Sequence, residues 1–107
     1  MKIDGLKGQL EFVVLASLRD GQKHGYAIIK ELRDRSRGEF DVLEGTLYPA
    51  LHRLEHAGLI RSRWATAAGR RRRVYELTKS GSKALAEQEL DWHRFVRTLN
   101  SVLEGTA

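Results

Sequence analysis

Residues 45–60, Gly-Thr-Leu-Tyr-Pro-Ala-Leu-His-Arg-Leu-Glu-His-Ala-Gly-Leu-Ile, decide the fold of this chain. Leu47, Leu51 and Leu54 recur at the spacing that places side chains on one face of an α-helix. The stretch therefore predicts a helix with a leucine stripe that points into a core. The other face of the helix is then left to point outward.

The expected ends of this helix and its outward face follow from the same residues. Thr46 is expected to be the N-cap, with Pro49 in the first turn and Gly58 just past the last turn. Projected at 100° per residue, the face opposite the leucines carries side chains that a partner can contact: Thr46, Tyr48, Pro49, His52, Arg53 and His56.

Two more helices are expected before this one. Residues 6–18 are apolar on nearly all sides and are followed by Asp20-Gly21, which is typical of a helix end. A second helix is expected from Gly25 to Arg35, with Ile28, Ile29 and Leu32 on one face. The decisive stretch is thus the third helix of a helical group.

After Leu59 the period changes to two, which predicts a β-hairpin with residues 67–69 at its tip. Arg61, Arg63 and Arg70 to Arg73 lie in this segment without any acidic residue among them. These six charges exceed the net charge of the whole chain, +5, so the positive charge is concentrated in one place. Such a patch favours a polyanionic partner, although a solvated basic loop is the plainer alternative.

Thr78 is expected to cap a last helix that carries more large apolar side chains than a short chain can cover. A second copy of the chain is the simplest partner for this helix and for the first one. The residues expected in the homodimer interface are Leu10, Val14, Leu85, Trp92, Phe95, Val96, Leu99, Val102 and Leu103.

The order of these elements predicts a mainly α (α+β) fold, a winged helix-turn-helix with a two-stranded β wing and a C-terminal dimerisation helix. We expect residues 1–79 to form the DNA-binding domain and residues 80–107 to form the dimerisation helix. In this architecture a helix enters the major groove while the wing reaches the neighbouring DNA backbone or minor groove.

The chain resembles the PadR family of transcription regulators. The resemblance rests on motifs that appear in the family's order: His24-Gly25-Tyr26, Gly45-Thr46-Leu47-Tyr48-Pro49-Ala50-Leu51, Arg53-Leu54-Glu55, Gly58-Leu59-Ile60, Tyr75-Glu76-Leu77-Thr78 and Gly81. It implies that Thr46, Tyr48 and Pro49 lie at a DNA surface and that Tyr26 approaches a phosphate. The family often has Gly and Pro before the basic part of the wing, whereas this chain has Thr66-Ala67-Ala68-Gly69.

The predicted function is sequence-specific binding of duplex DNA, as a homodimer on an approximately palindromic operator, with repression as the outcome. The expected DNA contacts are Tyr26, Thr46, Tyr48, Pro49, His52, Arg53, Arg70, Arg71, Arg72 and Arg73. Arg53 is the candidate for a guanine edge, with a phosphate or a neighbouring acid as alternatives. Tyr26 and Tyr48 are alternatively core aromatics. The rival functions are a protein-interaction module and a metal- or ligand-responsive regulator.

Two motifs invite other chemistry. His52-Arg53-Leu54-Glu55-His56 matches the H-x-x-E-H string of zinc peptidases, but a catalytic site needs a third protein ligand, and we predict neither an enzyme nor a metal or other cofactor. Adventitious zinc binding by the two histidines stays open. Trp92 and Phe95 are a candidate site for a small aromatic effector, against the simpler view that they only pack in the dimer.

The expected location is the cytoplasm. The chain has no cysteine, and its longest apolar run, residues 12–18, is far shorter than the ~20 residues that a membrane span requires. The first nine residues lack the pattern of an export signal.

Overall fold

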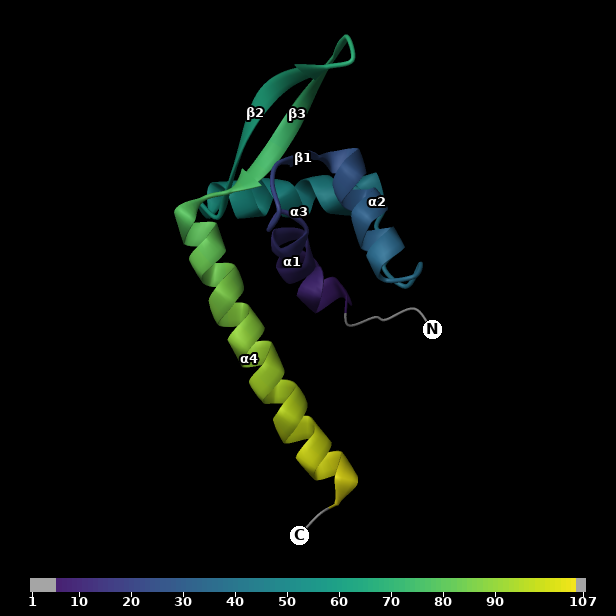
Figure 1. The fold of residues 1–107 in the computed structure, drawn as a ribbon, viewed down its shortest axis with the longest axis vertical. Helices are drawn as coiled ribbons and strands as arrows, with labels where there is room; N and C mark the ends of the chain where they lie inside the picture. Colours follow the sequence, from purple (N-terminus) through teal and green to yellow (C-terminus); the bar gives the residue numbers. More distant parts are fainter. Residues whose placement is uncertain (1–5, 106–107) are drawn as a thin grey trace.

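The computed structural model describes residues 6–105, with side chains described from Gln9 onward. Its elements are α1 (Leu6–Ser17), β1 (Lys23–His24), α2 (Gly25–Arg35), α3 (Glu44–His56), β2 (Ile60–Ala67), β3 (Arg70–Leu77) and α4 (Lys79–Glu104). Figure 1 shows α1, α2 and α3 packed together as a body, with the β2–β3 hairpin projecting on one side and α4 extending on the other. This is the winged helix-turn-helix order that the sequence predicts.

The leucine stripe of α3 is the centre of the core. Leu47 and Leu51 are fully buried and Leu54 is 2% exposed, as predicted. Leu10 and Val14 of α1 belong to the same core, with exposed fractions of 5% and 0%. Their predicted place in a dimer interface is therefore wrong, because α2 and α3 of the same chain already cover that face of α1.

Helix α3 begins earlier than predicted. Its N-cap is Leu43, whose backbone carbonyl accepts from the N–H groups of Thr46 and Leu47 at 3.0 and 2.9 Å. Thr46 lies inside the first turn instead, and Pro49 lies in the second turn. The other end is as expected: Gly58 has φ +77°, and Leu59 N–H reaches the Leu54 carbonyl at 3.0 Å in a Schellman motif.

The sheet has three antiparallel strands in the order β1-β3-β2, rather than the two predicted. The third strand, β1, pairs His24 with Val74, and its two residues are too few to show a period of two. Ala68 and Gly69 connect β2 to β3 with φ values of +54° and +75°, which matches a type I′ turn. The four consecutive arginines lie in β3 itself, starting just after this turn.

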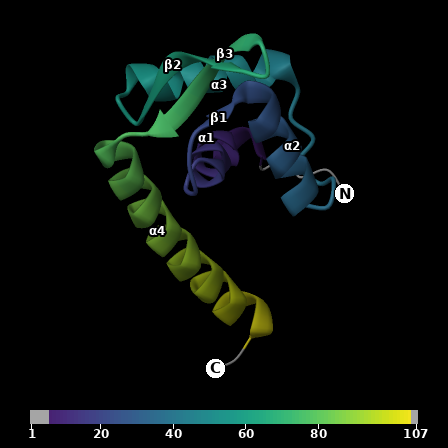
Figure 2. The ribbon, with the colours of Figure 1, turned by 45° about the horizontal axis from the view of Figure 1, so that its top comes forward.

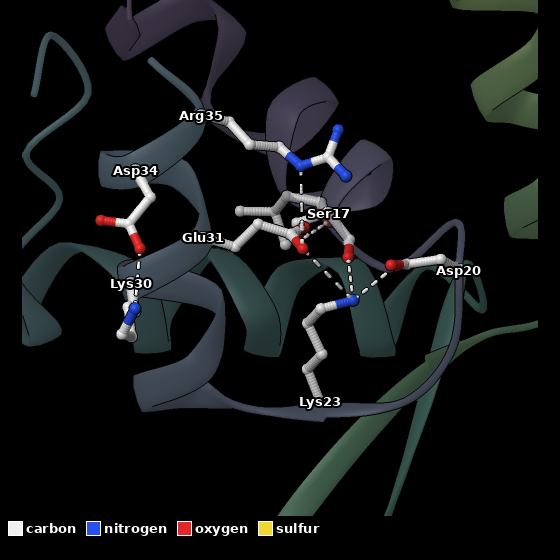
Figure 3. A network of polar contacts seen from close by, with 8 residues as sticks. Ser17, Asp20, Lys23, Lys30, Glu31, Asp34 and Arg35 are labelled. Atoms are coloured by element: carbon white, nitrogen blue, oxygen red, sulfur yellow. Dashed lines mark hydrogen bonds and ion pairs between the residues drawn. The ribbon is translucent and has the colours of Figure 1, made fainter. Parts of the chain in front are cut away.

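A polar network fixes β1 against the helices (Figure 3). The Lys23 Nζ donates to the Ser17 carbonyl at 2.7 Å and to Asp20 Oδ1 at 2.5 Å, and it lies 3.7 Å from Glu31 Oε1. Arg35 approaches the same Glu31 carboxylate at 3.8 Å. Because Lys23 points into this network, its neighbour His24 points to the other face of the sheet.

Helix α4 contacts the body along its N-terminal half, where Arg19 pairs with Glu89 at 2.8 Å. Thr78 is the N-cap, as predicted: its Oγ1 accepts from Gly81 N–H at 3.0 Å and donates to the Gly58 carbonyl at 2.6 Å. Leu85 is 3% exposed and packs into the protomer core, so its predicted role in the dimer is wrong. The C-terminal end of α4 extends away from the body (Figure 2). None of the helices in residues 6–105 is both long and apolar enough to cross a membrane.

Candidate nucleic-acid interface

An open groove of about 780 Å³ lies where the start of α2, one side of α3 and the wing come together. It brings six of the predicted DNA contacts into one place, together with residues that the sequence did not single out. The residues that line it are His24, Gly25, Tyr26, Tyr48, Trp64, Arg70, Arg71, Arg72, Arg73 and Tyr75. No carboxylate is among them, so the groove presents positive charge and aromatic surface.

The remaining predicted contacts lie outside the groove on the exposed face of α3. Thr46, Pro49, His52 and Arg53 are all exposed, as predicted. The Nε of Arg53 donates to Glu11 Oε1 at 2.7 Å, with side chains that are 59% and 46% exposed. An ion pair this exposed is worth little, so a stronger acceptor can displace Glu11 at small cost.

Tyr48 lies across the start of α2 because residue 25 is glycine. A Cβ at Gly25 would lie 2.5 Å from the Tyr48 hydroxyl oxygen, which is closer than a Cβ approaches a neighbouring heavy atom, so the tyrosine ring would have to shift. Tyr48 is 45% exposed and Tyr26 is 56% exposed. The alternative that these tyrosines are core aromatics is therefore wrong: both present their rings at the surface of the groove.

The four wing arginines are not equivalent, because strand alternation places them on opposite faces of β3. Arg72 Nη1 lies 2.8 Å from His24 Nε2. On the other face, Arg73 Nε donates to Ser62 Oγ at 2.9 Å, and Ser62 in turn donates to Glu55 Oε2 at 2.5 Å. Arg73 thus ties the wing to α3.

Trp64 is a groove residue that the sequence did not single out. It is 52% exposed, and the guanidinium carbons of Arg71 and Arg73 lie 4.9 and 5.5 Å from its ring centre. Cations over an indole face are held by its quadrupole. The signal was present in the sequence as an aromatic residue opposite an arginine run in the hairpin, since Trp64 pairs with Arg73.

His24 is the second residue that the sequence analysis missed as a site residue. Its Nδ1 accepts from Ala27 N–H at 3.2 Å and so caps α2. Burial, followed by the nearby Arg72 charge, lowers the pKa of His24 below its usual value. The ring is therefore kept neutral at neutral pH. A histidine directly before a helix start was the available signal.

The glutamate of the zinc-like string on α3 is engaged by the wing. Glu55 accepts a hydrogen bond from Ser62 and lies 3.9 Å from Arg73 Nη2. Over residues 6–105, no three His, Cys, Asp or Glu side chains gather in a way that could hold a metal ion.

Helix α4 carries a second aromatic feature. The Trp92 and Phe95 ring centres lie 5.8 Å apart at an interplanar angle of 37°. Both side chains are exposed, by 42% and 55%. They border a cavity of about 340 Å³ between α1 and α4, which is also lined by Gln9, Phe12, Gln88 and Asp91.

Comparisons with known proteins agree with this geometry. Transcriptional regulator Rv3488 of Mycobacterium tuberculosis is 45% identical over 74 residues, which cover 69% of this chain and 66% of that protein. A PadR-like transcriptional regulator from Bacillus cereus has a TM-score of 0.85 at 28% identity, covering 97% of this chain and 100% of the other. Bacillus subtilis PadR, solved in complex with operator DNA, has a TM-score of 0.67 at 26% identity, covering 74% of this chain and 45% of its own.

The family match spans the groove, both of its helices and the wing. Residues 14–87, more than half of the chain, match the transcriptional regulator PadR-like family. This range includes β1, α2, α3 and the hairpin, and it ends two residues after Leu85. The chain therefore belongs to the PadR-like family of transcriptional regulators, and it is a regulator rather than an enzyme.

Proposed function

We propose that this chain binds duplex DNA sequence-specifically through the groove and the exposed face of α3. The observation that carries the proposal is the junction of an exposed helix face with a groove lined by four arginines and no carboxylate. The solved complex of Bacillus subtilis PadR with operator DNA supports it by likeness of fold. Helix α3 enters the major groove in this proposal, while the wing and Tyr26 contact the backbone.

The proposed base-reading residues lie on α3: Thr46, Tyr48, Pro49, His52 and Arg53. Arg53 is the proposed guanine contact, because its pair with Glu11 engages Nε and is exposed to solvent. Arg70 and Arg71, next to the turn, supply the outermost phosphate or minor-groove contacts. Arg72 and Arg73 are the proposed DNA contacts on the part of the wing that lies closer to the helices.

The proposed regulator is a homodimer that pairs through α4. Large apolar side chains remain exposed along it at Trp92, Phe95, Leu99, Val102 and Leu103, with Val96 half-buried beside them. A helix face of this kind favours a second copy as its cover. In this proposal residues 1–79 are the DNA-binding domain and residues 80–107 the dimerisation helix, of which residues 1–5 and 106–107 lie outside the described structure.

Two paired chains would place their α3 helices in successive major grooves, ~34 Å apart. The operator is then an approximate palindrome. Binding over a promoter excludes RNA polymerase, so repression in the bacterial cytoplasm is the proposed outcome.

Selection of bound sequences from random duplex DNA, followed by a salt titration on the selected duplex, tests the proposal. We expect a palindromic consensus and an affinity that falls steeply as salt rises. The slope should decrease by about one unit for each of Arg70 and Arg71 replaced by alanine. Replacement of the exposed Arg37 by alanine, far from the wing, is the matched control and should leave the slope unchanged. No binding to any duplex in dilute buffer would overturn the proposal in favour of a protein-interaction module.

A small aromatic effector is a second proposal, favoured by the cavity beside Trp92 and Phe95. A flat apolar ligand would stack on the exposed indole. The test is tryptophan fluorescence on addition of flat aromatic compounds, in a Trp64→Phe background that leaves Trp92 as the only indole. A response that survives Trp92→Ala in the unaltered background would assign the signal elsewhere and rule the site out.

A further inference from the structure

His24 occupies an unusual position in the groove, because both nitrogens of its ring face hydrogen-bond donors. The Nδ1 lies 3.2 Å from the backbone nitrogen of Ala27, and the Nε2 lies 2.8 Å from Arg72 Nη1. The ring centre lies 6.4 Å from that of Tyr26 in a stacked arrangement, and both side chains line the groove.

A count of protons shows that these two contacts conflict. The backbone N–H of Ala27 always carries its proton, so Nδ1 must offer a lone pair. A neutral imidazole then carries its single proton on Nε2, where it meets Arg72, and a guanidinium has donors only. The other tautomer moves the same conflict to Ala27, and a doubly protonated ring has no lone pair at all. No protonation state of His24 satisfies both neighbours.

An anionic oxygen placed between the two side chains removes the conflict. It accepts from His24 Nε2–H and from Arg72 at once, while Nδ1 continues to cap α2. Arg70, Arg71 and Arg73 line the same groove, and the residues that line it include no carboxylate to compete for Arg72. Burial and the Arg72 charge hold the pKa of His24 low, so the ring acts as a neutral donor.

We propose that His24 and Arg72 together bind one phosphodiester oxygen of duplex DNA, with His24 donating through Nε2–H and Arg72 shifting outward along the groove to admit the oxygen. The inference rests on the proposed function and deepens it, because it adds a DNA contact on β1 to those on α3 and the wing.

Replacement of His24 by asparagine separates the two roles of the ring. Asparagine caps a helix as well as any residue, but its side chain is too short to reach beyond the cap. We expect His24→Asn to keep the melting temperature and to weaken binding of the selected duplex about tenfold per half-site, the range of one hydrogen bond to a charged group. Its salt slope should stay unchanged, because the lost donor is neutral. His24→Asp also keeps the cap, but its negative charge repels phosphate, so the loss should be larger.

Arg72→Ala provides the second arm of the experiment. This variant should weaken binding and also lower the salt slope by about one unit per subunit. If both side chains hold the same oxygen, the double variant His24→Asn, Arg72→Ala should lose less affinity than the two single losses added together. Unchanged affinity of His24→Asn, or strict additivity in the double variant, would overturn the shared phosphate site while DNA binding itself stands. Failure of the unaltered protein to bind any duplex would instead overturn the proposed function, and this inference with it.

Discussion

Helices α1 and α4 are both rich in apolar residues, yet those of α1 are largely buried and many of those of α4 are exposed. Leu10 and Val14 of α1 are covered by the same chain, whereas Phe95 and Leu99 of α4 are 55% and 41% exposed. The difference lies in the neighbours: α1 contacts α2, α3 and α4, while α4 touches the body mainly through α1 and the end of β3. An apolar pattern therefore predicts that a helix face will be covered. It does not tell whether the cover comes from the same chain or from a partner.

The largest effect should come from a charge in the α1 core. Val14 is fully buried, so Val14→Asp places an unpaired carboxylate among apolar side chains and should cost about 4 kcal/mol or more, enough to unfold many small domains. Urea unfolding followed by circular dichroism measures it. Val102→Asp, at a side chain that is 72% exposed on α4, is the matched control and should leave the protomer folded. Equal losses in the two variants would break the contrast between the helices.

A second test charges the exposed face of α4. The double variant Phe95→Lys, Leu99→Lys should stay folded but become monomeric, because like charges would meet across the proposed dimer interface. Light scattering gives the mass and circular dichroism the helix content. A persistent dimer would show that the copies pair elsewhere, and an unfolded chain would show that the body needs its partner to fold.

A third test concerns the close contact between the body and Gly81, in the first turn of α4. A Cβ added there would lie 1.8 Å from the backbone carbonyl oxygen of Leu59, and neither backbone can yield easily. Gly81→Ala should therefore cost about 2–3 kcal/mol of protomer stability, in the range of overpacked cores. The neighbouring exposed Ser82→Ala should cost almost nothing. Wild-type stability in Gly81→Ala would contradict the close contact between α4 and the body.

The smallest expected effect is the pH dependence of stability that comes from His24, which lies in the body. Because the folded protein lowers the pKa of His24, the unfolded chain takes up a proton first as pH falls through about 6.5. This contribution to stability is thus complete above that pH and is lost from there down to the lower folded pKa. His24→Asn should show a smaller decline over the same window in urea titrations. The difference should persist in the Phe95→Lys, Leu99→Lys background; its disappearance there would tie the His24 environment to the dimer.

Much of the fold follows from sequence signals that have a local cause. The bounds of α2, Gly25 to Arg35, the buried leucines of α3 and the Thr78 cap are as expected, because periodicity and capping act within a few residues. The start of α3 could not be found in this way. Its N-cap, Leu43, works through its backbone alone, so the side chain of Thr46 suggested a start that the helix does not use.

The site was only partly predictable for a related reason. Exposure of Tyr48 and Arg53 follows from the phase of one helix. The partners that Arg72 and Arg73 meet depend on the register of three strands, one of which has only two residues. His24 meets Arg72 across that register, so no local pattern could reveal the pair.

The Thr78 hydroxyl joins two helices at one point, since it caps the start of α4 and donates to the Gly58 carbonyl just past the end of α3. The proposed dimer helix and the proposed DNA-facing helix are thus coupled at a direct hydrogen-bonded contact. Helix α4 has 26 residues, or about 39 Å of rigid rod, so each degree of tilt at its root displaces its far tip by about 0.7 Å. In the opposite direction, a sideways displacement of that tip tilts α4 at its root and so changes the angle at which α3 is held.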